Sequence, residues 1–282
     1  NDLQEIKFDI LKNLQFLFYQ LQTSKRACNT RALETSFGWT RQDLGIQHDC
    51  QEFFTVFLDA ILEKVRNTES YNQLINLFQV RTMSYLENST YQFHYELPKQ
   101  DQYALRLTII PGKNLQEMLD EPNIEPMEYN IPNVGNQMCN RIEYISQLPK
   151  VLFIHLIRTT YDIERDEMVR VAFPVTYQEQ IDIKYDNGQK TANYTLHAIL
   201  VHQGTTAGHY TAIIRPTTGD EWIQFNDAFV QRVTQREALN QLNDCYLLVY
   251  GRTETAEEDF KKVEDDEIPE QVKHLGTNIH FV

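Results

Sequence analysis

Hydrophobic and polar residues alternate with two different periods, which divide the chain into a helical first part and a strand-rich second part. Within residues 1–70, "ILKNLQFLFYQLQTS" places Ile10, Leu14, Leu17 and Leu21 at intervals of three and four residues, which predicts an amphipathic helix. "DCQEFFTVFLDAILEKV" repeats this period and predicts another helix. The first part of the chain is therefore expected to be a lobe of helices.

From about residue 77 the pattern changes to short runs of β-branched and aromatic residues. "FQVRTMSYL", "TYQFHYEL" and "YALRLTII" predict strands, and "NLQEMLDE" predicts a short helix. Residues 121–140, rich in Asn, Pro and Glu, are expected to be loop or an irregular extension. The apolar run "PKVLFIHLIR" at 149–158 predicts a central strand, followed by four more in "TLHAILVHQ", "HYTAIIRP", "EWIQFND" and "CYLLVYGR". Helices first and then a mostly antiparallel sheet indicate the α+β class.

Composition narrows the range of partners. The 282 residues are 41% hydrophobic and carry a formal net charge of −14, so a sizeable core is expected and a nucleic acid is not an expected partner. No apolar run reaches the roughly 18 residues of a membrane span, so no membrane association is expected. Beyond Gly251, "TETAEEDFKKVEDDEIPE" predicts an exposed, partly helical acidic tail, which is a candidate docking segment for a recruiting protein.

Four scattered cysteines, Cys28, Cys50, Cys139 and Cys245, include no C-x-x-C pair. This spacing disfavours a disulfide framework or a structural zinc site, and no metal or cofactor is expected. A reducing compartment, the cytoplasm or the nucleus, is the expected location. Cys50, beside Phe53 on an apolar helix, and Cys245, within a strand, are interpreted as core residues.

A candidate catalytic histidine begins the strand of "LVHQGTTAGHYTAIIRP". Burying an imidazole without a partner costs roughly 1–3 kcal/mol, so His209 needs a partner or serves to move protons. The next predicted strand ends in "FND", which brings Asn226 or Asp227 within reach of His209 if the two strands are neighbours. An amide or carboxylate there would orient the imidazole as in a nucleophile–base–orienter system. A core histidine satisfied by a carbonyl group is the alternative.

Polar groups also crowd the start of the second predicted helix, in "GIQHDCQEFF". Gln47, His48, Asp49, Gln51 and Glu52 all fall near its first turn. Helix capping accounts for some of these residues, because acids and amides stabilise a helix N-terminus. Five polar groups exceed what capping requires, and the carboxylates are also suited to hold arginine side chains of a bound peptide.

Taken together, these stretches resemble the ubiquitin-specific proteases, a family of cysteine deubiquitinases. "SFGWTRQDLGIQHDCQEFFTVFLDAI" is similar to the glutamine–aspartate box of that family, "LPKVLFIHLIR" to its palm strand, and "LHAILVHQGTTAGHYTAII" to its histidine box. "WIQFNDAFVQRVT" and "CYLLVYGR" resemble its closing strands. "LQTSKRA", the ending "DEIPEQVKHL" and the lack of zinc cysteines are similar to the branch that contains the herpesvirus-associated ubiquitin-specific protease.

The resemblance implies a papain-like fold of thumb, fingers and palm. Residues 1–252 would be one catalytic domain, with thumb helices in 1–70, fingers and the start of the palm in 77–145 and the palm in 146–252; residues 253–282 would be an acidic C-terminal extension. The implied activity is hydrolysis of the isopeptide bond at the C-terminus of ubiquitin, through an acyl-thioester. The implied partners are ubiquitin and ubiquitinated proteins.

The resemblance also implies a role for each matched residue. His209 would be the general base, oriented by Asn226, with Asp227 as a supporting or alternative carboxylate. Asp49 and Glu52 would pair with arginines in the C-terminal tail of ubiquitin. The channel for that tail would be lined by Gln47, Gln51 and Tyr210.

The nucleophile of the family has no match in this sequence. The cysteine box "N-x-G-N-T-C" is absent, and none of the four cysteines has similar neighbours. The expectation is that the nucleophilic cysteine lies upstream in the full-length protein, so that this chain alone is inactive. The alternatives are a catalytically inactive ubiquitin-binding pseudoprotease or scaffold, and a structural α+β domain without either function.

Overall fold

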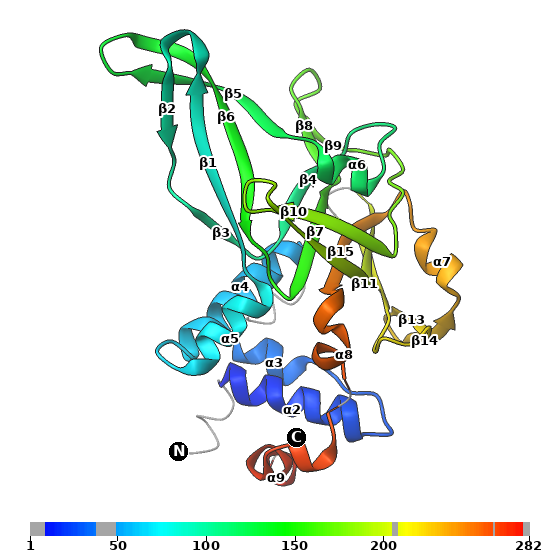
Figure 1. The fold of residues 1–282 in the computed structure, drawn as a ribbon. Coiled ribbons are helices and arrows are strands. Elements are labelled where there is room, and N and C mark those ends of the chain that lie inside the picture. The colour runs from blue at the N-terminus through cyan, green and yellow to red at the C-terminus, as the bar shows by residue number, and fades with distance from the viewer. Residues whose placement is uncertain (1–8, 38–48, 205–207, 262, 279–282) are drawn as a thin grey trace. The chain divides into compact units, whose positions relative to one another are not determined.

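The computed structural model describes residues 9–37, 49–204, 208–261 and 263–278 (Figure 1). Contacts within the chain divide these residues into two compact units. The first comprises the described parts of 1–71 and 262–282, and the second is residues 72–261. The expected catalytic domain of residues 1–252 with an extension at 253–282 stays a prediction; the last helix of that extension joins the N-terminal helices.

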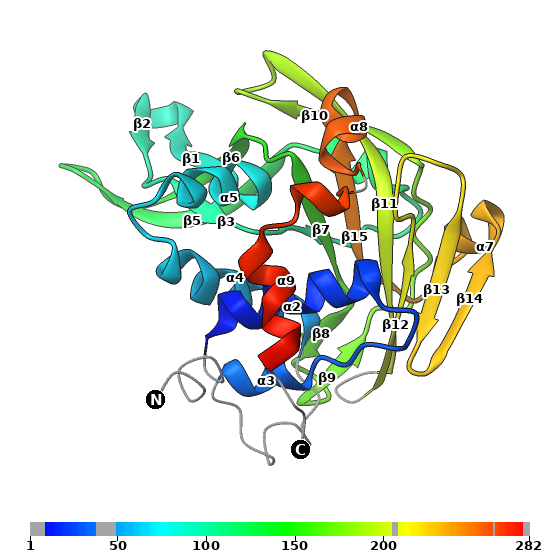
Figure 2. The ribbon, with the colours of Figure 1, turned by 90° about the horizontal axis from the view of Figure 1, so that it is seen from below.

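The first unit is helical, as the 3.6-residue period of its sequence predicted. Its main helices are α2 (Ile10–Thr23), α3 (Arg31–Ser36), α4 (Cys50–Lys64) and α9 (Glu270–Asn278). Helix α2 contacts each of the other three, and Figure 2 shows α2 and α9 side by side. Helix α5 (Glu69–Phe78) runs from this unit into the second one.

The buried face of α2 differs from the predicted stripe. Ile10, Asn13 and Phe16 are its buried residues, whereas Leu21 is 61% exposed. The buried positions recur every three residues, and Asn13 is accommodated because its Nδ2 donates to the carbonyl oxygen of Asp9 at 3.0 Å. The expectation that Leu21 lies on the core face was therefore wrong, although the helix itself was predicted correctly.

An eight-stranded sheet forms the larger part of the second unit, as far as the described residues show. Its strands follow the order β14-β13-β12-β11-β15-β7-β4, and β10 pairs with β11. All pairs are antiparallel except β4 with β7. The strands are β4 (Leu105–Thr108), β7 (Val151–Ile157), β10 (Gln180–Tyr185), β11 (Lys190–Gly204), β12 (Gly208–Ile214), β13 (Trp222–Asn226), β14 (Phe229–Val233) and β15 (Cys245–Arg252).

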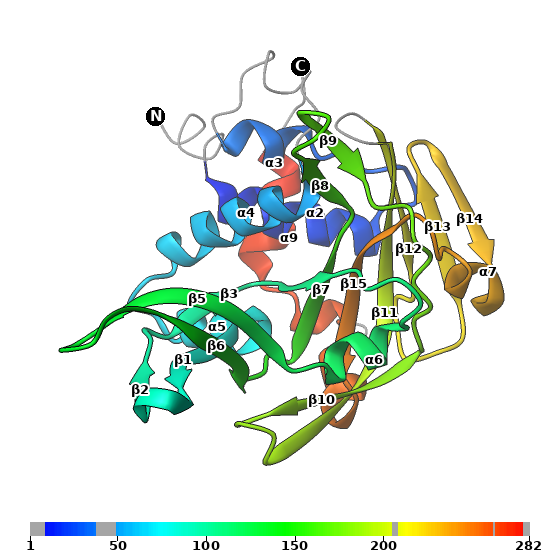
Figure 3. The same cartoon turned by 90° about the horizontal axis from the view of Figure 1, so that it is seen from above.

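The core of this unit lies on the central strands, where the sequence has its longest apolar runs. Leu152, Ile154 and Leu156 of β7 are fully buried, and so are Leu196 and Ile199 of β11. Helix α6 (Leu115–Asp120) packs against β10, as Figure 3 shows, and α7 (Gln235–Leu239) buries Ala238. The predicted α+β class with a mostly antiparallel sheet is confirmed.

A five-stranded sheet projects from the eight-stranded one in Figure 1. Its strands, counted over the described residues, are β1 (Val80–Asn88), β2 (Phe93–Glu96), β3 (Gln100–Gln102), β5 (Asn123–Ile131) and β6 (Gly135–Gln147). A short 3₁₀ turn, η2 (Ser89–Tyr91), links β1 and β2. A small hairpin of β8 (Thr159–Asp162) and β9 (Glu167–Arg170) stands separately.

The prediction of a loop or an irregular extension at 121–140 is wrong, because that segment forms β5 and the start of β6. Strand β5 is an edge strand with nearly all its side chains exposed, so it carries no hydrophobic alternation that a sequence pattern could show. Asn133 and Gly135 form the hairpin turn with φ of 63° and 97°. Backbone pairing to β6 therefore decides the strand, and Pro126 is tolerated because it lies on an edge strand.

The first part of the segment after β15, up to residue 261, is attached to the sheet rather than wholly exposed. It contains η3 (Thr253–Thr255) and α8 (Ala256–Asp259), whereas η4 (Asp265–Glu267) belongs to the first unit. Phe260 stacks on His197 of β11 with ring centroids 3.6 Å apart, and Lys150 pairs with Asp259 at 2.7 Å. No helix among the described residues is long and apolar enough to span a membrane.

Candidate active site

Two neighbouring strands bring His209 and Asn226 together. His209 is the second residue of β12, and Asn226 is the last residue of β13, which pairs with β12 in antiparallel register. The Nε2 atom of His209 lies 2.6 Å from Oδ1 of Asn226. The convergence of these two side chains, expected from the order of the strands, is therefore present in the structure.

Asp227 occupies a second position beside the imidazole. Its Oδ2 lies 4.0 Å from His209 Nε2, and its side chain is 79% exposed, compared with 44% for His209. The residue adopts a left-handed backbone conformation with φ of 50° at the turn between β13 and β14. At this distance Asp227 contributes charge rather than a hydrogen bond, so Asn226 is the hydrogen-bond partner of the imidazole.

The contact with Asn226 determines which ring nitrogen of His209 can act as a base. An amide oxygen accepts hydrogen bonds only, so Nε2 must carry the proton of the neutral ring and donate it to Oδ1. The Nδ1 atom then has the lone pair available to accept a proton. The arrangement is suited to general base catalysis at Nδ1.

Tyr210 points to the opposite face of β12, as strand alternation requires. Its ring stacks on His202 of β11 at 4.3 Å and meets Tyr246 of β15 edge-on at 5.9 Å. Packing between three strands gives this side chain a defined position. Its assignment to a substrate channel stays a prediction.

The remaining predicted binding residues belong to the first unit. Asp49 is the N-cap of α4, and its Oδ1 accepts from the backbone N–H groups of Gln51 at 2.8 Å and Glu52 at 3.0 Å. Capping is therefore one function of Asp49, and Glu52 is exposed in the first helical turn. Gln51 donates to the Thr55 hydroxyl at 3.0 Å, whereas Gln47 lies outside the described residues.

None of the four cysteines, all of which are described, forms a disulfide. Cys139 and Cys245 are buried, as the core interpretation of Cys245 predicted, and burial raises the pKa of the Cys245 thiol to about 12. Such a thiol is not ionised near neutral pH and does not serve as a nucleophile. Cys50 begins α4 and is only partly buried, so its interpretation as a core residue was wrong.

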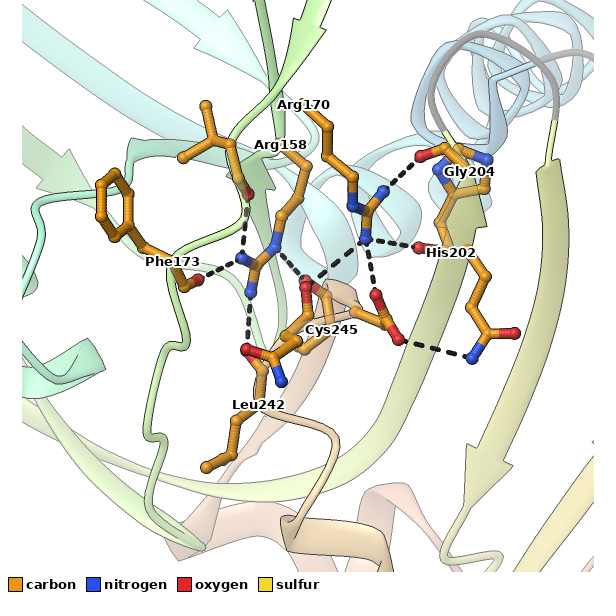
Figure 4. Close-up of polar contacts among 11 residues, drawn as sticks. Arg158, Arg170, Phe173, His202, Gly204, Leu242 and Cys245 are labelled. Atoms are coloured by element: carbon orange, nitrogen blue, oxygen red, sulfur yellow. Dashed lines mark hydrogen bonds and ion pairs between the residues drawn. The ribbon is translucent and has the colours of Figure 1, made fainter.

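Two arginines make buried or partly buried contacts that the sequence reasoning did not predict. Arg158 is buried, and burial lowers the pKa of its guanidinium, which donates to the carbonyl oxygens of Cys245, Val171, Phe173 and Leu242. Arg170 of β9 contacts the end of β11, as Figure 4 shows. A basic residue on a short, mostly polar hairpin gives no sequence signal of such a contact.

Comparison with solved structures supports the fold assigned to these elements. The chain is similar to the structure of the SAGA DUB module, Ubp8/Sgf11/Sus1/Sgf73, bound to monoubiquitin, with a TM-score of 0.75 and 21% sequence identity. The likeness covers 92% of this chain and 60% of that chain. The α+β arrangement described above is therefore shared with a chain of that module.

The sequence comparison identifies the family. The model of the family described as ubiquitin carboxyl-terminal hydrolase matches residues 1–250, and the chain belongs to that family. Ubiquitin carboxyl-terminal hydrolase 5 of Schizosaccharomyces pombe is 29% identical over 96% of this chain. Ubiquitin C-terminal hydrolase 12 of Arabidopsis thaliana is 31% identical over 83% of it. The chain spans only 27% and 22% of the lengths of these two relatives.

Proposed function

We propose that this chain is part of a deubiquitinase that hydrolyses isopeptide bonds at the C-terminus of ubiquitin. The observation that carries the proposal is the 2.6 Å contact between His209 Nε2 and Asn226 Oδ1 at the ends of two neighbouring strands. Family membership supports the reaction class. We also propose that the chain belongs to the branch that contains the herpesvirus-associated ubiquitin-specific protease, which the stretches "LQTSKRA" and "DEIPEQVKHL" support. The proposed location of the protein is the cytoplasm or the nucleus.

The proposed reaction uses His209 in both of its steps, acylation of the cysteine and hydrolysis of the thioester. Nδ1 first accepts the proton of a cysteine thiol, and the thiolate attacks the carbonyl carbon of the isopeptide bond. The imidazolium then returns the proton to the departing lysine amine, which leaves an acyl-thioester. Water, deprotonated by the same nitrogen, attacks the thioester carbon; the C–S bond breaks, and the departing thiolate takes that proton back from the imidazolium. Asn226 keeps Nε2 engaged throughout, and the carboxylate of Asp227 stabilises the imidazolium at 4.0 Å.

The proposed nucleophile is a cysteine other than the four in this chain, and it belongs to the full-length protein. The burial of Cys139 and Cys245 argues against these two thiols, and for the partly buried Cys28 and Cys50 the support is that neither lies in a match to the family's cysteine box. Asp49 and Glu52 are the proposed contacts for arginines of the ubiquitin tail, with Gln47, Gln51 and Tyr210 along the tail channel. Ubiquitinated proteins are the proposed substrates, and the acidic C-terminal segment is the proposed contact for a recruiting protein.

Reaction of the full-length protein with ubiquitin that carries an electrophilic C-terminal group tests the proposal. An adduct seen by mass spectrometry on a cysteine outside this chain is the expected result. His209→Ala should slow adduct formation by at least about 100-fold, because general base catalysis is lost. His94→Ala is the matched control, since His94 is exposed on the other sheet of the same unit.

Two outcomes would contradict the proposal. Ubiquitin binding without any adduct would indicate the inactive ubiquitin-binding alternative. An adduct that forms equally fast in the wild-type protein and in His209→Ala would show that this histidine is not the base.

A further inference from the structure

The strand that carries His209 depends for its position on the end of β11. Strands β11 and β12 pair through Gly204 with Gly208 and through Gln203 with His209. Any displacement of the last residues of β11 would therefore move the backbone of His209 relative to Asn226. The residues that hold the end of β11 therefore also determine the distance between His209 and Asn226.

Arg170 of β9 holds that end from outside the sheet. One guanidinium nitrogen, Nη1, donates to the carbonyl oxygen of Gly204 at 2.5 Å, and the other, Nη2, donates to that of His202 at 2.8 Å (Figure 4). The side chain of Arg170 is only 17% exposed. A planar guanidinium with several fixed donors is suited to this double contact, whereas a lysine ammonium presents a single point charge.

Asp244, just before β15, holds Arg170 in turn. Its Oδ1 lies 2.8 Å from Arg170 Nη2, and its Oδ2 accepts from Gln203 Nε2 at 3.4 Å. The backbone carbonyl of Asp244 also accepts from the N–H of His202 at 2.9 Å. Strands β9, β11 and β15 are thereby joined through one partly buried ion pair.

Gly208 makes the approach of β12 to this cluster very close. A Cβ atom at this position would lie 2.1 Å from the carbonyl oxygen of Gln203 and 2.6 Å from Nε2 of His202. Both of these residues contact Asp244 or Arg170. The residue that immediately precedes His209 is thus packed against the segment that Arg170 and Asp244 hold.

We propose that Arg170 and Asp244 are positioning residues that fix the β11 end and thereby keep His209 in hydrogen-bonding distance of Asn226. The role rests on the proposed function of His209 as the base. Neither residue touches the reacting atoms in this role. Their effect reaches the imidazole through Gly204, Gly208 and the backbone pairing of the two strands.

The test is nitrogen-15 NMR of the histidine rings in the 282-residue chain, with the His209 signals assigned from a His209→Gln variant. In the wild-type chain, His209 should show one tautomer, with the proton on Nε2. Arg170→Met retains the length of the side chain without its donors, and Asp244→Leu removes the carboxylate. In both variants the two ring nitrogens of His209 should move toward averaged shifts, because the ring exchanges between tautomers once the contact with Asn226 loosens.

Three controls make the result decisive. Arg165→Met alters an exposed arginine on the same hairpin and should leave the His209 spectrum unchanged. Arg170→Lys should restore the wild-type signals only in part. The ring of His197, which is buried in the middle of β11, reports the integrity of the sheet and should keep its shifts in every variant.

Unchanged His209 signals in Arg170→Met would overturn the proposal. Equal changes at His197 would also overturn it, because they would show general loosening of the sheet instead of positioning.

In the full-length protein, Arg170→Met should lower kcat by about 10-fold to 100-fold with little change in KM, because the variant loses the alignment of His209 and not substrate binding. The NMR result does not require a nucleophile. The NMR experiment can therefore refute the positioning proposal even if the full-length protein hydrolyses ubiquitin conjugates. An inactive full-length protein would refute only the proposed function.

Discussion

His197 lies in the middle of β11, where its imidazole is buried between Phe260 and the backbone of Arg215. The rings of His197 and Phe260 stack at 3.6 Å and are almost parallel, and His197 Nδ1 lies 3.4 Å from the carbonyl oxygen of Arg215. Burial, together with the positive charge of Arg215, lowers the pKa of His197 to about 4. The folded protein therefore keeps this imidazole neutral at a pH where the unfolded chain is already protonated.

The sign of the effect on stability follows from this difference in proton uptake. As the pH falls below 6.5, the unfolded chain gains a proton at His197 that the folded protein does not gain, so the free energy of unfolding decreases. The decrease levels off near pH 4, where the folded protein is protonated as well. For these two pKa values the loss between pH 7 and pH 5 amounts to about 2 kcal/mol.

Urea unfolding of the chain and of His197→Phe at about pH 7 and pH 5 measures this contribution. Phenylalanine retains an aromatic ring against Phe260 but does not titrate, so its own loss between the two pH values should be smaller by about 2 kcal/mol. His94→Phe, at an exposed position, should behave as the wild type does. An equal loss in His197→Phe and in the wild type would refute the reasoning, because other groups would then carry the whole acid sensitivity.

Two further predictions concern packing and thiol chemistry. Gly251→Ala should destabilise the protein by about 1–3 kcal/mol in urea unfolding, because the new Cβ would lie 2.3 Å from the ring of Phe260. Gly219→Ala is the control; its new Cβ would have no contact shorter than 3.4 Å, so the free energy of unfolding should change by less than about 0.5 kcal/mol. Equal effects of the two changes would contradict the packing argument. Iodoacetamide should leave Cys245 and Cys139 unmodified in the native chain and modify both in urea, as judged by peptide mass spectrometry. Both thiols are buried, and burial raises the pKa of the Cys245 thiol to about 12. Modification of Cys245 in the native chain at the rate seen in urea would show that this thiol is accessible.

Sequence patterns located the helices and the central strands because burial imposes a strong period on them. The nearly continuous apolar runs of β7 and β15 and the partly alternating run of β11 lie in the core, where each strand must present hydrophobic residues. The hairpin of β5 and β6 has no such requirement on its exposed edge, and the same residues were expected to be loop or an irregular extension. Similarly, the stripe predicted on α2 was displaced, because contacts with the other helices selected its buried face.

By itself, the sequence determined the α+β class, the family resemblance and the candidacy of His209 with Asn226, because these depend on short motifs and on strand order. The tertiary structure alone decided that Nε2 faces the amide oxygen and that Nδ1 is left as the basic nitrogen. It also decided the contacts of Arg170 and Asp244 with the end of β11, which join residues 32 to 74 positions apart. Such contacts depend on the packing of the separate β8–β9 hairpin against the end of the large sheet, and neither periodicity nor local spacing encodes them.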